Sequence, residues 1–340
     1  MRHKIIVIGI AGTAKNTGKT TTLNCLLKEA DRRNLSVAVT GIGYDGEELD
    51  NVTRLPKPRV SVFSNSIVTT SEQCLDSSTA AVEILHRTGM FTSLGEVFIL
   101  RVVQPGVMVI AGPGKTRELQ LVVEKMKQYA VDYIFVDGSL NRITPMSVVQ
   151  SVIFTTGASR STDIAFVSSE MNAIEHLLQL PATSAVEQSD IFDIPILLEA
   201  RDVNALSSAW TTRYSALQIS KLISLPALER LTARCLNGSI PIQELIVPNP
   251  FAMIVHGNVI QTFKYISQLI GSHIPVTCRN TSRLACITAN PFFPQLIANN
   301  YRTNYIDKRE LVRQLQTSCS TPVFDTQETE PAVLFNTCVS

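Results

Sequence analysis

The stretch from Gly12 to Thr20, with the sequence GTAKNTGKT, combines residue types that bind phosphate groups. It closes in Gly18, Lys19 and Thr20, an ending typical of a phosphate-binding loop (P-loop). In such a loop the backbone N–H groups and the positive end of the following helix cradle the phosphates, while the lysine reaches the β and γ oxygens. The threonine hydroxyl is a ligand for Mg²⁺. The sequence therefore predicts a nucleotide site formed by Gly12, Thr13, Ala14, Lys15, Asn16, Thr17, Gly18, Lys19, Thr20 and Thr21.

The spacing of this loop differs from that of the commonest P-loop. Five residues separate Gly12 from Gly18, so the first glycine stands one position early. A subset of P-loop proteins begins the loop Gly-Thr in this register, and the stretch resembles the loop of the dethiobiotin-synthetase-like (SIMIBI) NTPases. Residues 15–20 also resemble the loop of molybdopterin-cofactor guanylylation accessory proteins. The resemblance implies a P-loop NTPase fold.

Lys15 adds a second positive charge to the loop, four residues before Lys19. In the deviant-loop ATPases that dimerise, an extra lysine five residues before the invariant one reaches across the dimer. In this chain the extra lysine stands one position closer. Three alternatives stay open for Lys15: contact with phosphate in its own chain, contact with phosphate across a homodimer, or a place in solvent.

A triphosphate bound with Mg²⁺ also needs carboxylates, which in parallel sheets stand at the carboxyl ends of strands. Asp137 closes the apolar stretch 132–137 and is the candidate for binding Mg²⁺ through water. Asp45 follows the expected second strand and is the candidate for binding metal or for positioning the attacking water. Each aspartate is followed by a glycine, so a local turn is the alternative for both.

These residues require a strand, a loop and a helix in that order. The apolar stretch 5–8 predicts a strand buried on both faces, and 20–33 has the apolar spacing of an amphipathic helix. The alternating stretch 35–40 predicts a second strand. This βαβ order predicts an α/β fold with a mostly parallel sheet flanked by helices.

The rest of the chain continues in alternating elements. Residues 107–117 predict a strand-to-helix turn with Leu119, Val122, Val123 and Met126 on the buried face of the helix that follows. Further strands are expected at 148–154, 194–198, 251–255 and 284–288, helices at 168–180, 258–271 and 308–316, and a loop at 290–294. We expect a P-loop nucleotide-binding domain over 1–180. Residues 181–340, which lack a recognisable catalytic constellation, are expected to form a second α/β region that contacts a protein partner.

Composition excludes several classes of protein. Hydrophobic residues make up 45% of the 340 residues and charged residues 17%, a composition that builds a packed core. The formal net charge of +1, without a basic run, argues against binding nucleic acid through its phosphates. No run approaches the roughly 20 apolar residues of a membrane-spanning helix.

Cysteine usage and the N-terminal residues bear on the compartment. The seven cysteines are odd in number, scattered and without CxxC spacing, so the sequence predicts neither a disulfide framework nor a zinc cluster. Residues 1–12 have the charged and apolar parts of a signal peptide, but the polar stretch 13–22 does not fit a cleavage region. A cytoplasmic location is expected.

Six stretches together resemble one family, in chain order: 12–21, 42–47, 55–60, 137–142, 155–159 and 288–291. The family is the P-loop subunit of the reactivase for adenosylcobalamin-dependent lysine and ornithine aminomutases. Because many NTPases share the loop, the stretches that are specific to this family are 55–60 (LPKPRV) and 137–142 (DGSLNR). The resemblance implies an ATP-driven accessory protein whose partners are an aminomutase and a reactivase co-subunit.

Within this resemblance, Arg142 follows the strand that ends at Asp137, at the rim where a γ-phosphate sensor would lie. Arg142 is therefore a candidate for stabilising charge in the transition state. The candidate catalytic residues are Lys19, Asp45 and Arg142. The candidate metal-binding residues are Thr20, Asp45 and Asp137.

Three functions remain open at this point. The first is an NTPase whose hydrolysis of ATP changes the conformation of a protein partner, and the second is a dethiobiotin-synthetase-like ligase or kinase for a small molecule. The third is a nucleotide-binding switch without turnover. No Asn/Thr-Lys-x-Asp stretch, the usual reader of guanine, occurs in the sequence, which favours ATP with Mg²⁺ and leaves GTP open.

Overall fold

The computed structural model describes residues 5–45, 59–138, 147–184, 188–255, 258–297 and 300–339. The chain divides into two compact units. The first unit comprises residues 1–168 and 284–340, and the second unit comprises residues 169–283. The expected division into 1–180 and 181–340 differs from this one. Residues 284–340, which were expected in the second region, belong to the first unit and extend its sheet.

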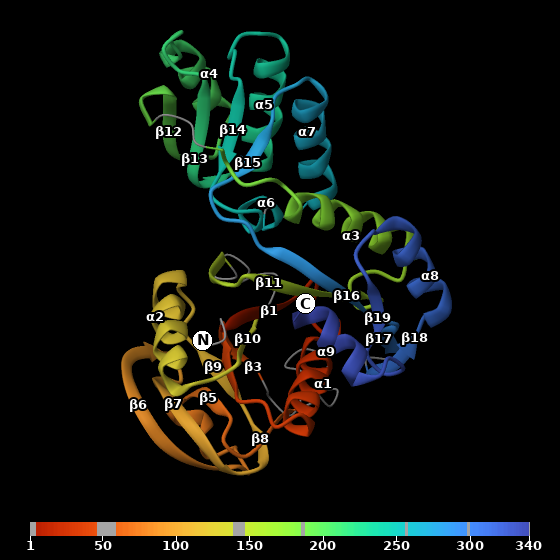
Figure 1. The fold of residues 1–340 in the computed structure, drawn as a ribbon. Helices are drawn as coiled ribbons and strands as arrows, with labels where there is room; N and C mark the ends of the chain where they lie inside the picture. Colours follow the sequence, from red (N-terminus) through yellow and green to blue (C-terminus); the bar gives the residue numbers. More distant parts are fainter. Residues whose placement is uncertain are drawn as a thin grey trace. The chain divides into compact units, whose positions relative to one another are not determined.

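The first unit is built on one large sheet (Figure 1). Within the described ranges, its nine strands lie in the order β19 (Val323–Asp325), β16 (Arg283–Asn290), β11 (Ser151–Gly157), β1 (Ile6–Gly12), β10 (Tyr133–Asp137), β2 (Val37–Gly41), β5 (Ile67–Ser71), β7 (Gly95–Gln104) and β6 (Ala81–Thr92). The pairs from β11 to β5 are all parallel, as is the pair β16–β19. The predicted α/β class with a mostly parallel sheet flanked by helices is therefore confirmed.

Helices cover both faces of this sheet. Helix α1 (Lys19–Arg32) and the C-terminal helix α9 (Pro331–Val339) lie on one face, and α2 (Thr116–Met126) lies on the other (Figure 1). The buried side of α2 is the predicted one, because its buried residues are Leu119, Val122, Val123 and Met126. Helix α1 likewise buries an apolar stripe at helical spacing: Leu23, Leu26, Leu27 and Ala30.

An antiparallel extension of the sheet was not predicted from the sequence. Strands β5, β7 and β6 pair antiparallel in that order, with β6 at the edge. Two small antiparallel pairs lie nearby: β3 (Gly43–Asp45) with β9 (Ile110–Gly112), and β4 (Val60–Val62) with β8 (Gly106–Met108). The short 3-10 helix at Glu72–Cys74 follows β5.

The second unit has its own parallel sheet, in the order β12 (Ile191–Leu197), β13 (Ala216–Ile223), β14 (Glu244–Val247) and β15 (Val276–Cys278). Its helices are α4 (Ala200–Ala209), α5 (Leu225–Leu236), α6 (Phe251–Ile254) and α7 (Val259–Gly271). Helix α3 (Ile164–Leu178) crosses the boundary between the units.

The strand expected at 251–255 is wrong, because Phe251–Ile254 is helix α6. All four residues of this helix are buried, and a short buried apolar run has the same pattern in a strand and in a helix. The preceding residues decide the outcome. The Asn249 side chain, one residue before the N-cap Pro250, accepts a hydrogen bond from the backbone N–H of Ala252 at 3.1 Å, which favours a turn at the start of this segment.

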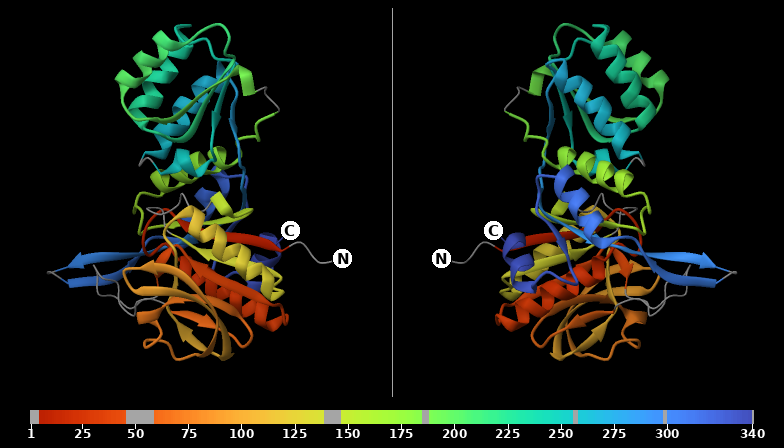
Figure 2. Two further views of the ribbon diagram at one scale, coloured as in Figure 1. Left: turned by 90° about the vertical axis from the view of Figure 1, so that its left-hand side faces the viewer. Right: turned by 90° about the vertical axis from the view of Figure 1, so that its right-hand side faces the viewer.

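Two further elements of the first unit differ from the expected ones. The strand expected at 148–154 is β11, which runs from Ser151 to Gly157 and includes two threonines that were expected in a loop. The loop expected at 290–294 is the start of an antiparallel hairpin, formed by β17 (Phe292–Ile297) and β18 (Asn300–Tyr305). This hairpin projects from the first unit as the blue pair of strands in Figure 2.

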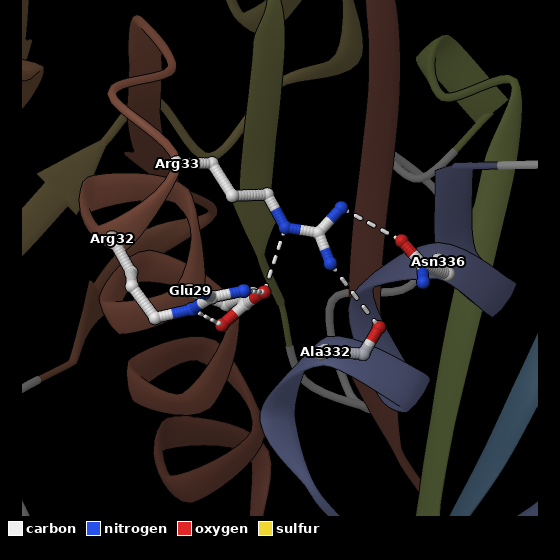
Figure 3. A network of polar contacts seen from close by, with 5 residues as sticks. All are labelled: Glu29, Arg32, Arg33, Ala332 and Asn336. Carbon is white, nitrogen blue, oxygen red and sulfur yellow. Dashed lines mark hydrogen bonds and ion pairs between the residues drawn. The ribbon is translucent and has the colours of Figure 1, made fainter.

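The C-terminal segment closes with α8 (Lys308–Ser318), β19 and α9. A polar network around Glu29 joins α1 to α9 (Figure 3). The buried Glu29 carboxylate accepts hydrogen bonds from Arg32 Nη2 and Arg33 Nε, each at 2.7 Å. Arg33 donates in turn to Asn336 Oδ1 at 2.7 Å and to the Ala332 carbonyl at 3.5 Å. The hydrogen bond from Arg32, followed by that from Arg33, lowers the pKa of Glu29 to about 2.

Replacing Glu29 with glutamine is expected to lower the free energy of unfolding by about 2 kcal/mol at neutral pH, because the three charge-assisted hydrogen bonds from Arg32 and Arg33 weaken. A folded pKa below the unfolded value of 4.5 means that this stabilisation is present above pH 4.5 and is lost as the pH falls through about 2. Urea unfolding at a series of pH values measures the difference between wild type and variant, which should shrink over this range. A difference that is independent of pH, or equal to that of the control Glu124→Gln at an exposed pair with Lys127, contradicts the interpretation.

Among the described residues, no helix has both the length and the hydropathy needed to cross a membrane.

Candidate phosphate-binding site

The predicted loop joins a buried strand to a helix in the first unit. Gly12 is the last residue of β1 and Lys19 is the first residue of α1. Two loop residues have left-handed backbone conformations: Asn16 with φ 62° and Gly18, the N-cap of α1, with φ 101°. The first helical hydrogen bond runs from Thr22 N to the Gly18 carbonyl at 2.9 Å. The N–H groups of the first helical turn therefore lie at the loop without acceptors within the helix.

Lys19 is folded over the loop. Its side chain is buried, with a relative exposure of 7% for the residue, and Nζ donates to the Ala14 carbonyl at 3.2 Å. The same carbonyl accepts a hydrogen bond from Thr17 Oγ1 at 3.0 Å. The ammonium group is thus held against the loop that precedes it, at the positive end of α1. This placement brings a positive charge and helix N–H groups to one short segment, which suits a phosphate.

Strand β11 supports the loop from one side through threonine hydroxyls. Thr13 Oγ1 lies 3.0 Å from Thr156 Oγ1, and Thr17 Oγ1 lies 2.8 Å from Thr155 Oγ1. The backbone N–H of Thr13 donates to the Thr155 carbonyl at 2.9 Å. A Cβ atom at Gly12 would lie 2.5 Å from the hydroxyls of both Thr17 and Thr155, so this close arrangement requires glycine. Sequence reasoning did not assign the two β11 threonines to the site.

Strand β16 supports the loop and the start of α1 through residues that lie 266 and 274 positions further along the chain than their partners. Thr288 Oγ1 lies 3.1 Å from Thr22 Oγ1 on α1. Asn290 Nδ2 donates to the carbonyl of Asn16 in the loop at 2.8 Å. A Cβ atom at Gly157 would lie 1.9 Å from the Asn290 carbonyl, and the φ of Gly157 is 150°, so glycine allows β16 to come this close. The sequence offered no local signal for these contacts.

Asp137 stands where the sequence placed it, at the carboxyl end of β10. In the sheet it pairs with Ile10 of β1 on one side and with Gly41 of β2 on the other. The residue is buried, and its carbonyl accepts a hydrogen bond from the Ile42 N–H at 2.8 Å. Asp137 therefore lies on the strand next to β1, opposite a residue two positions before Gly12.

The structure describes little of the two other candidates, Asp45 and Arg142. The backbone of Asp45 lies in β3, opposite Ile110 of β9, but its side chain lies outside the described residues. Arg142 falls in the segment 139–146, which also lies outside them. Their catalytic and metal-binding roles remain predictions.

The remaining loop residues differ in exposure. Lys15 is exposed, and Thr20 and Thr21 at the start of α1 are half-buried. Among the side chains that the structure describes, no three His, Cys, Asp or Glu groups form a metal cluster.

The stretch expected to be a strand-to-helix turn rather than a second phosphate loop has that structure. Strand β9 ends at Gly112 and α2 begins at Thr116. Lys115 at the N-cap pairs with Glu118 of the same helix, with Nζ 2.9 Å from Oε1. The loop between β1 and α1 therefore remains the candidate phosphate-binding site of the first unit.

Comparison of the chain with protein-family models, with curated proteins and with solved structures finds no match. The functional interpretation therefore depends on the residues and contacts of this chain.

Proposed function

We propose that this chain binds a nucleoside triphosphate with Mg²⁺ at the loop 12–20 and hydrolyses it. One observation carries the proposal: Lys19, at the N-terminus of α1, is buried and folded onto the Ala14 carbonyl of a loop that contains two left-handed residues. An ammonium group, helix N–H groups and a tight loop are the parts that a polyphosphate requires. The buried Asp137 at the end of the neighbouring strand supports the same interpretation.

Each residue has a role that follows from its chemistry. The loop and the first turn of α1 would hold the phosphates, and Lys19 would neutralise charge on the β and γ oxygens. Thr20 would be a direct Mg²⁺ ligand, and Asp137 would bind the metal through water. Mg²⁺, when bound, supplies charge neutralisation at the transferring phosphoryl group. Phosphoryl transfer needs little covalent help from the protein, so positioning and charge account for the activity.

We also propose that the nucleotide is ATP and that a protein partner responds to it. The resemblance of several stretches to the reactivase P-loop subunit supports a cobalamin-dependent aminomutase and a reactivase co-subunit as partners. The second unit is a compact α/β body of its own, and it is the part of the chain that we expect to contact the partner.

Hydrolysis assays with ATP and GTP test this proposal, with and without an aminomutase that turnover has inactivated. Hydrolysis of ATP that rises when the aminomutase is added supports an accessory NTPase, because the partner would then complete a catalytic site that is incomplete in the isolated chain. Turnover that requires a small amine or carboxylate substrate, and that yields a phosphorylated or cyclised product, supports the ligase or kinase instead. Binding of neither nucleotide contradicts both.

Replacing Thr20 with alanine is expected to weaken ATP binding about tenfold in the presence of Mg²⁺ and to change it little in EDTA, because the hydroxyl acts through the metal. Calorimetric titration with and without Mg²⁺ measures both affinities. Thr317→Ala, which removes an exposed hydroxyl from α8, is the control and should leave both affinities unchanged. Equal losses in the two conditions contradict the assignment of Thr20 as a metal ligand.

A further inference from the structure

Asn290 joins three parts of the first unit, two through its side chain and one through its backbone. Its Nδ2 donates to the carbonyl of Asn16 in the phosphate loop at 2.8 Å. Its Oδ1 accepts from the backbone N–H of Phe292, the first residue of the β17–β18 hairpin, at 3.2 Å. Its backbone carbonyl accepts from the N–H of Ala158, just after β11, at 3.0 Å. One amide therefore bridges the loop and the hairpin.

The contact falls at a sensitive point of the loop. Asn16 has φ 62°, a left-handed conformation that glycine and asparagine adopt more readily than other residues, so the chain turns sharply at this point. The C=O and N–H groups of a trans peptide point in opposite directions, so the bond from Asn290 that fixes the Asn16 carbonyl also fixes the direction of the Thr17 N–H. The orientation of a loop N–H group decides whether it can reach an anion.

Two further hydrogen bonds hold the base of the hairpin, close to Asn290. Ser159 Oγ donates to the Phe292 carbonyl at 2.8 Å, and the Ile306 N–H donates to the Pro291 carbonyl at 3.0 Å. Beyond this base the two strands pair only with each other among the described residues, and they carry exposed apolar side chains, Leu296, Ile297 and Tyr305. Asn290 therefore contacts the base of a hairpin that is attached to the first unit at that end and projects from it (Figure 2).

We infer that Asn290 is a positioning residue of the phosphate loop, and that through it the state of the loop is passed to the β17–β18 hairpin. This inference rests on the proposed nucleotide site. In the free chain, Asn290 keeps the loop in the conformation that binds phosphate. Without this contact, fewer molecules have that conformation, and the apparent affinity for ATP decreases in proportion to the fraction that keeps it. When phosphate fixes the loop, the Asn16 carbonyl stays in place and the Phe292 contact of Asn290 is held with it.

The experiment compares ATP binding, with Mg²⁺, in the full chain and in three variants. Asn290→Ala removes the amide and should weaken binding about tenfold, the effect of losing one hydrogen bond that preorganises the loop. Asn290→Asp keeps the shape but removes the donor and adds a negative charge, so its affinity should fall further. Asn304→Asp makes the same charge change on β18, where Asn304 donates to Gln295 instead of the loop, and should stay within twofold of wild type.

A second readout separates positioning from a purely structural role. In the wild type, saturating ATP should slow amide hydrogen exchange at residues 292–297 and 300–305 several-fold. In Asn290→Ala, with ATP raised until binding is again saturated, exchange in the hairpin should be the same with and without ATP. A residue that only stabilised the fold would lower the melting temperature of the variants but would leave the effect of ATP on the hairpin intact.

The outcomes distinguish the inference from the proposed function. If wild type binds ATP while both Asn290 variants bind it equally well, the inference is wrong and the nucleotide site stands. If wild type binds ATP without any change in hairpin exchange, the inference is also wrong, whether or not the variants fold. If wild type binds no nucleotide, the proposed function fails and the inference fails with it.

Discussion

Replacement of Lys19 with alanine is expected to abolish ATP hydrolysis and to weaken ATP binding by at least a hundredfold. The Lys19 ammonium is the buried positive charge that the fold holds against the loop, 3.2 Å from the Ala14 carbonyl. Neutralising phosphate charge in a site shielded from water contributes several kcal/mol, and alanine removes all of it. Steady-state hydrolysis and calorimetric titration measure the two losses.

The same substitution should leave the fold intact. Removing the Lys19 side chain deletes one hydrogen bond to the loop carbonyl, which contributes about 1 kcal/mol. Thermal unfolding followed by circular dichroism should therefore show only a small decrease in melting temperature. Lys28→Ala, at an exposed position of the same helix, is the control for loss of a lysine from α1. Unchanged affinity and turnover in Lys19→Ala contradict the P-loop interpretation.

Replacement of Asp137 with asparagine is expected to lower the hydrolysis rate by two or more orders of magnitude while ATP binding changes little. The substitution keeps the size of the side chain at the end of β10 but removes the charge that, in the proposed function, would orient metal-bound water. A loss in kcat without a comparable loss in affinity is the signature of an interaction made mainly in the transition state.

The control for Asp137→Asn is Asp132→Asn, at the opposite end of β10. Asp132 precedes the strand, and its Oδ2 accepts from the Ser36 N–H at 2.8 Å, far along the strand from the loop. This control should hydrolyse ATP at the wild-type rate. If Asp137→Asn keeps full turnover, the metal role passes to Asp45, whose charge can be removed in the same way.

The sequence was sufficient to predict the local parts of the candidate site. A buried strand, a Gly-Lys-Thr loop end and an amphipathic helix follow one another directly, so their periodicity and spacing identified β1, the loop and α1. The position of Asp137 at a strand end was predicted for the same reason, because an apolar run closed by Asp-Gly is a local pattern.

The support of the loop could not be predicted in this way. Asn290 and Thr288 reach the loop and α1 only because β16 joins the same sheet after the whole second unit has intervened. Pairing between strands so far apart leaves no periodic trace in the sequence. The helix Phe251–Ile254, where a strand was expected at 251–255, was missed for another reason, since a short, fully buried apolar run has the same pattern in a strand and in a helix.

The return of the chain to its first sheet has a consequence for biosynthesis. During translation, β1, α1, β10 and β11 emerge early, but the strand that carries Asn290 emerges only after residues 169–283 have been made. Folding of such a sheet depends on contacts between distant parts of the chain and is slow compared with the folding of local elements. On the ribosome, the nascent polypeptide therefore carries its Gly-Lys-Thr segment for most of its elongation before the strand that braces that segment exists.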